Sequence, residues 1–75
     1  MLQFTVVVEK TIEGVDASIP SIPECETWAR DEDEALEKLL ERLAFFLNKK
    51  MGFKHDFDFM RREEGQTFYK LIIRS

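Results

Sequence analysis

Cysteine, histidine, proline and glycine are all scarce in this sequence. Its 75 residues include one cysteine, one histidine, two prolines and three glycines. A single cysteine excludes an internal disulfide and a multi-cysteine metal cluster. No apolar run approaches the ~20 residues of a membrane-spanning helix, and no basic leader precedes an apolar stretch at the N-terminus. We therefore expect a cytoplasmic protein with no cofactor and no metal site.

The charges are unevenly distributed along the chain. Fifteen acidic and eleven basic residues give a net charge of −4, which is the wrong sign for a general nucleic-acid binder. Acidic residues dominate between positions 24 and 41, whereas most basic residues lie toward the C-terminus. A chain this short forms one domain, over residues 1–75, with a small core, so association with another chain would add stability.

The first part of the chain has the pattern of three strands. Residues 1–10 alternate between apolar and polar side chains, as in a half-buried strand. The apolar face comprises Leu2, Phe4, Val6 and Val8. A hairpin turn over residues 11–14, in which Gly14 is able to adopt a positive φ, leads into a second strand over residues 15–19. Prolines in the corner 20–23 end that strand because proline lacks the backbone donor, and a third strand follows over residues 25–28.

A single amphipathic helix follows these strands. Asp31 opens it as the N-cap, and Glu34 reaches back toward the cap. Gly52 ends it. With about 100° per residue, one side of the helix is apolar and the other charged. The apolar side comprises Leu36, Leu39, Leu40, Leu43, Phe46 and Leu47. Phe45 points nearly opposite Leu36, so it is exposed, covered by another subunit or packed under the C-terminal segment.

The C-terminal part has the pattern of a second hairpin, with strands over residues 55–62 and 67–74 joined at 63–66. The faces depend on the length of this turn, and the register below is the one that follows if Glu64 and Gly65 form a two-residue turn. In that register one face carries Phe57, Phe59, Phe68 and Ile72, and the other carries Met60, Tyr69, Leu71 and Ile73.

These elements predict an α+β fold, a small antiparallel-rich sheet with one helix on one face, in the chain order β-β-β-α-β-β. One helix covers one side of the sheet, so an apolar set is left for a protein partner. The predicted partner-binding residues are Val7, Trp28, Phe45, Phe57, Phe59, Phe68 and Ile72.

The N-terminal and central residues resemble the pattern of the HicB-like antitoxins. That pattern is a strand reading Phe-Thr-Val-Val, a glycine at the first turn, an alanine in the second strand, a proline–apolar–proline segment before a cysteine, and an acidic-Ala-Leu helix start. The matching residues are Phe4, Thr5, Val6, Val7, Gly14, Ala17, Pro20, Ile22, Pro23, Cys25, Glu34, Ala35 and Leu36. Glu24 and Ala29 stand where the family commonly has glycine, and Asp31 replaces a threonine cap.

The resemblance implies a partial RNase H-like fold and a non-catalytic antitoxin that neutralises a small HicA-like ribonuclease by occluding it. The expected partner is a small basic, toxin-like protein, whose charge would complement the acidic segment. We also expect a homodimer or higher homo-oligomer. In full-length relatives a DNA-binding region follows this domain, and the chain ends before one fits. We therefore expect no DNA binding and no membrane association from this chain.

Catalytic interpretations have weaker support. RNase H-like nucleases hold metal ions with clustered carboxylates, which Asp16, Glu24 and Glu26 could supply. Alternating charges on strands are ordinarily solvated, however. Cys25 and His55 lack a third residue placed for a triad, and we expect a buried cysteine and an exposed histidine. We predict no catalytic residue and no enzyme activity.

A second binding function stays open. The C-terminal hairpin combines aromatic residues with lysines and arginines, and aromatic side chains on a basic sheet stack single-stranded bases. Its aromatic residues are Phe57, Phe59, Phe68 and Tyr69. The acidic net charge weighs against this alternative, an RNA- or single-strand-binding protein.

Overall fold

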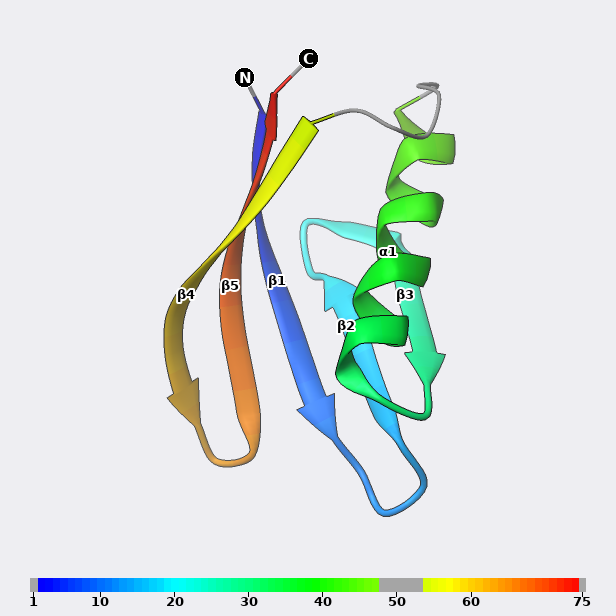
Figure 1. Ribbon diagram of the computed structural model, residues 1–75, viewed down its shortest axis with the longest axis vertical. Coiled ribbons are helices and arrows are strands. Elements are labelled where there is room, and N and C mark those ends of the chain that lie inside the picture. Colours follow the sequence, from blue (N-terminus) through cyan, green and yellow to red (C-terminus); the bar gives the residue numbers. More distant parts are fainter. Residues whose placement is uncertain (1, 48–53, 75) are drawn as a thin grey trace.

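The computed structural model describes residues 2–47 and 54–74, and within them it forms a five-stranded antiparallel sheet with one helix on one face (Figure 1). The elements are β1 (Leu2–Lys10), β2 (Val15–Ile19), β3 (Ile22–Ala29), α1 (Glu32–Phe46), β4 (Lys54–Glu63) and β5 (Gln66–Arg74). This chain order and the α+β class were predicted. Across the sheet the order is β3-β2-β1-β5-β4, so β5 rather than β4 pairs with the central strand β1. In the described part of the chain, no helix is long and apolar enough to cross a membrane.

The turn between β1 and β2 needs its glycine for a different reason from the predicted one. Thr11 closes the turn: its backbone N–H donates to the Gly14 carbonyl at 2.7 Å, and its Oγ1 accepts from the Gly14 N–H at 3.1 Å. Among the described glycines, Gly65 has a positive φ and Gly14 does not. A Cβ at position 14 would lie 2.5 Å from the Ala29 carbonyl oxygen and 2.7 Å from the Trp28 ring. The predicted positive φ is therefore wrong, and Gly14 allows the close approach of β3.

The third strand is longer than predicted. β3 begins at Ile22 and ends at Ala29, so Pro23 lies inside the strand and does not precede it. Proline is tolerated there because β3 is an edge strand, on which backbone groups facing away from the sheet need no ladder partner. The predicted corner is thus limited to Pro20 and Ser21. Ile19 and Ile22, on either side of these two residues, pair with each other.

The helix begins as predicted. Asp31 is its N-cap, and its Oδ1 accepts a hydrogen bond from the Glu34 N–H at 2.8 Å. The Glu34 carboxylate does not reach back toward the cap as predicted, because it lies 3.5 Å from Lys38 Nζ, one turn along the helix. α1 ends at Phe46, and Gly52, the predicted end, lies outside the described residues. The buried side of α1 comprises Ala35, Leu39, Leu40, Leu43 and Ala44.

The predicted apolar stripe of the helix is only partly buried. Its centre, from Leu39 to Leu43, is enclosed. Leu36 and Leu47 are half-buried, and Phe46 is 51% exposed. In β1 the burial also varies along the predicted apolar face, because Val6 and Val8 are enclosed, Phe4 is half-buried and Leu2 is exposed.

The C-terminal hairpin has the predicted two-residue turn. Glu64 and Gly65 have φ values of 43° and 81°, and Glu63 pairs with Gln66 next to them. Two successive positive φ values are typical of the type I′ turn that suits the twist of a hairpin. Beyond the turn, the ladder shifts between Phe59 and Arg61, so Met60 is the extra residue of a β-bulge.

This bulge reverses the predicted faces of β4. Phe57 pairs with Leu71 and Phe59 pairs with Tyr69, so both phenylalanines lie on the face that carries the core. The prediction that they share a face with Phe68 is wrong. A regular ladder from the same turn would place Asp58 opposite the fully buried Leu71, and the bulge avoids burying that carboxylate.

The helix covers only one half of its face of the sheet. α1 packs on β3 and β2, and the side chains enclosed there form the core together with parts of β1 and β5. Figure 1 shows β4 and β5 to one side of α1 and not beneath it. We call the face that carries α1 the inner face and the opposite one the outer face. On this half of the inner face Leu71 and Ile73 of β5 are enclosed, whereas His55 and Phe59 of β4 are exposed, so within the described residues its open part lies along β4.

Candidate functional site

A row of aromatic side chains occupies the open half of the inner face. We call it the aromatic strip, and it comprises His55, Phe57, Tyr69 and Phe59. The neighbouring rings meet edge to face, with centroids 5.6 Å apart for His55 and Phe57, 6.0 Å for Phe57 and Tyr69, and 6.2 Å for Phe59 and Tyr69. Such contacts hold the rings in fixed orientations. Phe59 is nevertheless 60% exposed.

The strip is tied to the helix by one hydrogen bond. The Tyr69 hydroxyl donates to Glu32 Oε2 at 2.8 Å, joining β5 to the first turn of α1. Burial raises the pKa of Tyr69 above its ordinary value, and the hydrogen bond and negative charge of Glu32 act in the same direction. Tyr69 therefore keeps its proton at neutral pH, and its ring is held beside the helix.

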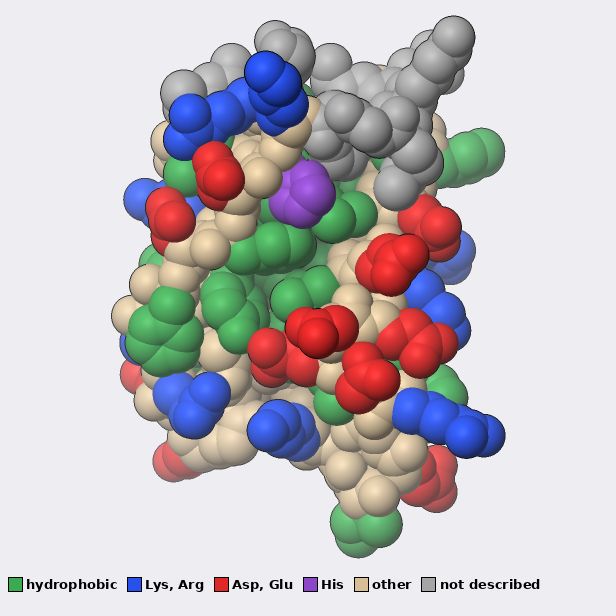
Figure 2. Space-filling model, in the orientation of Figure 1, with side chains coloured by type: hydrophobic (Ala, Val, Ile, Leu, Met, Phe, Trp, Pro, Cys, Tyr) green, Lys and Arg blue, Asp and Glu red, His purple; other side chains and the backbone are tan. Residues whose placement is uncertain are grey.

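Acidic side chains border the strip along the helix. Glu32 contacts Tyr69 directly, and the charge of Asp33 also acts on the tyrosine. Glu37, one turn after Asp33, continues this border, because residues four apart lie on the same helix face. Arg62 lies at the turn end, where its Nε donates to Thr67 Oγ1 at 3.2 Å. Figure 2 shows the hydrophobic side chains between β4 and α1 with a group of acidic side chains over the helix.

Similarity to known proteins provides no template for this surface. No family model, curated protein or solved structure matches this chain. The strip must therefore be interpreted from its own chemistry. Exposed rings beside a row of carboxylates form an apolar contact area with negative potential at its border, which suits a partner with apolar and basic side chains.

The predicted partner-binding residues do not form one surface. Phe57 and Phe59 lie in the aromatic strip, on the inner face. Phe45 is 90% exposed and lies on the other side of α1, beside a hollow that Thr27 and Arg42 also line.

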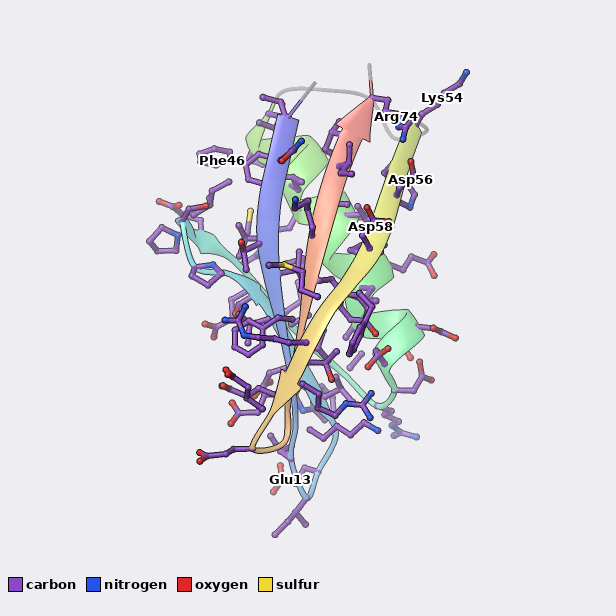
Figure 3. The ribbon with its side chains drawn as sticks, turned by 90° about the vertical axis from the view of Figure 1, so that its left-hand side faces the viewer. Glu13, Phe46, Lys54, Asp56, Asp58 and Arg74 are labelled. Carbon is purple, nitrogen blue, oxygen red and sulfur yellow. The ribbon has the colours of Figure 1, made fainter. Side chains whose placement is uncertain are left out.

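The remaining members of the predicted set lie on the outer face. They are Val7, Phe68, Ile72 and Trp28. Their strand neighbours on either side point inward and include the enclosed Val6, Val8, Leu71 and Ile73. Figure 3 looks toward this face, with α1 behind the sheet. The structure thus separates the predicted set into two sheet faces and one position on the helix.

Residues considered for catalysis lie in unsuitable places. Cys25 is enclosed, as predicted, and burial raises the pKa of its thiol, so it is a poor nucleophile. His55 is exposed, as predicted, and its ring packs edge-on against Phe57. Asp16 pairs with Trp28 on the outer face. In residues 2–47 and 54–74, no three His, Cys, Asp or Glu side chains are grouped so as to hold a metal ion.

The predicted set lacks two rings of the strip, His55 and Tyr69, and the carboxylates of its border, Glu32, Asp33 and Glu37. A regular ladder from the Glu64–Gly65 turn predicts Tyr69 on the face opposite Phe57 and Phe59, and the bulge at Met60 places all three on one face. The consecutive polar residues Arg61 and Arg62 interrupt the alternation of β4 and are the signal for the bulge.

Proposed function

We propose that this chain is a non-catalytic protein-binding module that acts like an antitoxin in the cytoplasm. In this proposal the aromatic strip docks on a small basic ribonuclease of the HicA-like kind and occludes its active surface. The observation that carries the proposal is the strip itself, in which Phe59 is 60% exposed beside Tyr69 and the acidic border of α1. Exposed aromatic residues are frequent anchors of protein interfaces.

The charge of the border favours a basic partner. Glu32, Asp33 and Glu37 lie in the first two turns of α1. The last turn of this helix carries no basic residue. An RNA-seeking toxin carries the positive charge that would complement this border and speed its association. The same carboxylates would repel phosphates, which makes the strip a poor surface for a nucleic acid.

The resemblance to HicB-like antitoxins concerns the fold more than the strip. Several matching residues are enclosed in the core, among them Val6, Ala17, Ile22, Cys25 and Ala35. Their place in β1, β2, β3 and the start of α1 supports a common framework, and the partial RNase H-like character of that framework belongs to this proposal. The partner surface is inferred independently, from the open half of the inner face.

Co-expression with a HicA-like toxin encoded beside this chain's gene tests the proposal. The wild-type chain is expected to restore growth and to copurify with the toxin. Phe59→Asp is expected to abolish both effects, because it replaces an exposed aromatic ring of the strip by a charge. Phe45→Asp is the matched control, since it changes a phenylalanine that is 90% exposed on the other side of α1.

The same material separates the alternatives. If the wild-type chain neither copurifies nor restores growth, or if Phe59→Asp does both as well as wild type, the strip is not the antitoxin surface. Salt-sensitive binding of a labelled oligonucleotide that is lost in Phe59→Asp would favour a single-strand-binding protein in its place.

A further inference from the structure

The outer face carries a row of side chains whose charge changes sign from one edge of the sheet to the other. Successive cross-strand pairs place the row in the order Glu26, Ser18, Val7, Phe68 and Arg61, from β3 to β4. Its centre is apolar and lies on the middle strand, β1. Arg61 lies over the Phe68 ring, 4.1 Å from its centroid, and its Nε lies 3.3 Å from Glu63 Oε2. Among the described residues, no helix covers this face (Figure 3).

We propose that the outer face binds a second copy of this chain. The two copies are related by a two-fold axis that runs parallel to β1 between their outer faces. This axis places β3 of one copy over β4 of the other, β2 over β5, and β1 over β1. Val7 then faces Val7 of the second copy and Glu26 faces Arg61 at both edges, while the exposed Glu9, two residues along β1, faces its counterpart across the axis. A closed two-fold interface pairs residues reciprocally in this way. A uniformly acidic or uniformly basic partner would instead meet like charge at one edge of the row.

The dimensions of the sheet permit this arrangement. The molecule measures 34 × 21 × 20 Å, so the outer face offers at most roughly 700 Å² per copy, which is of the order of a standard interface. Aligned sheets pack with their strands about 30° apart. Strands about 4.8 Å apart place the edge residues about 10 Å from β1. A rotation of about 30° between the two sheets therefore shifts each edge residue by about 5 Å relative to its partner in the other copy. Long arginine and glutamate side chains span that displacement.

Charge exchange between the two edges tests the dimer. Sedimentation velocity at 1–200 µM, chosen as roughly the range of weak homodimers, is expected to give a wild-type species of twice the 8.9 kDa chain mass. Glu26→Arg alone and Arg61→Glu alone each oppose like charges at both edges, and each is expected to dimerise at least tenfold more weakly than wild type. An equimolar mixture of the two variants restores both pairs and is expected to form the heterodimer. Glu41→Arg, the same charge change on α1, is the control.

A second measurement does not change the charges. Val7→Cys places a thiol on the proposed axis and is expected to be joined by a short bismaleimide, whereas Ile12→Cys at the tip of the β1–β2 turn is not. The native Cys25 is enclosed and does not compete. A wild-type chain that stays monomeric at the highest concentration, or single-charge variants that dimerise as well as wild type, would overturn the proposal. Both tests are independent of the aromatic strip, which lies on the inner face.

Discussion

Replacing Tyr69 by phenylalanine removes one hydroxyl and leaves the ring of the strip in place. The hydroxyl donates to Glu32 at 2.8 Å across 37 residues of sequence. A hydrogen bond to a charged group contributes about 1.5–3 kcal/mol when it is shielded from water. Both side chains of this pair are only half-buried, so we expect Tyr69→Phe to lower the free energy of unfolding by about 1 kcal/mol. For a domain of this size, that loss lowers Tm by about 4–8 °C.

Urea unfolding followed by circular dichroism measures this loss at pH 7. Glu32→Gln keeps a weaker acceptor and should cost less than Tyr69→Phe. The double variant should cost little more than Tyr69→Phe alone, because the two side chains act through one contact. Additive losses in the double variant would mean that the hydroxyl and the carboxylate stabilise the fold separately.

The pH dependence provides an independent check. Burial and Glu32 raise the pKa of Tyr69 in the folded state, so the folded chain holds the phenolic proton more tightly than the unfolded chain. The resulting stability is fully present below the unfolded pKa of about 10 and is lost as the pH rises through the higher folded pKa. The difference in stability between wild type and Tyr69→Phe should therefore shrink at strongly alkaline pH. A difference that is absent at pH 7, or that does not change with pH, would refute the role assigned to this contact.

Two further predictions concern single positions of the backbone. Gly14→Ala should cost about 2 kcal/mol in urea unfolding because its Cβ meets the β3 backbone, whereas Gly65→Ala should cost about 1 kcal/mol from its positive φ alone; a stabilising Gly14→Ala would contradict the close approach. Deletion of Met60 should remove the bulge, keep Phe59 opposite Tyr69 and change the stability by less than about 1 kcal/mol. Loss of the nuclear Overhauser contacts between these two rings would show that the deletion changes the register.

The elements and the core followed from local patterns in the sequence. Alternation in residues 2–8, the Asp31 cap and the two-residue turn at Glu64 and Gly65 each act over a few residues, and the structure has all three. Pro23 was misplaced because its acceptability depends on β3 being an edge strand. Strand order is decided by packing between distant segments, and one sequence does not display it.

The candidate site was predictable only in part, because one bulge decides which face β4 presents. Phe57 and Phe59 were recognised as surface residues, but their partner Tyr69 was assigned to the opposite face. The acidic residues Asp56 and Asp58 indicate that the ladder of β4 is not regular. A regular ladder would have turned both toward the core, whereas in the structure Asp56 pairs with Arg74 at 3.0 Å and Asp58 lies opposite Lys70.

The two outermost strands also determine how such chains can aggregate. Pro23 has no backbone donor in the edge strand β3, and β4 has an irregular ladder at Met60 and several charged side chains. Neither strand is a good template for adding a further strand, which is how sheets polymerise into fibres. A crowded solution of this protein should therefore remain free of fibrils, although much of its apolar surface is open to solvent.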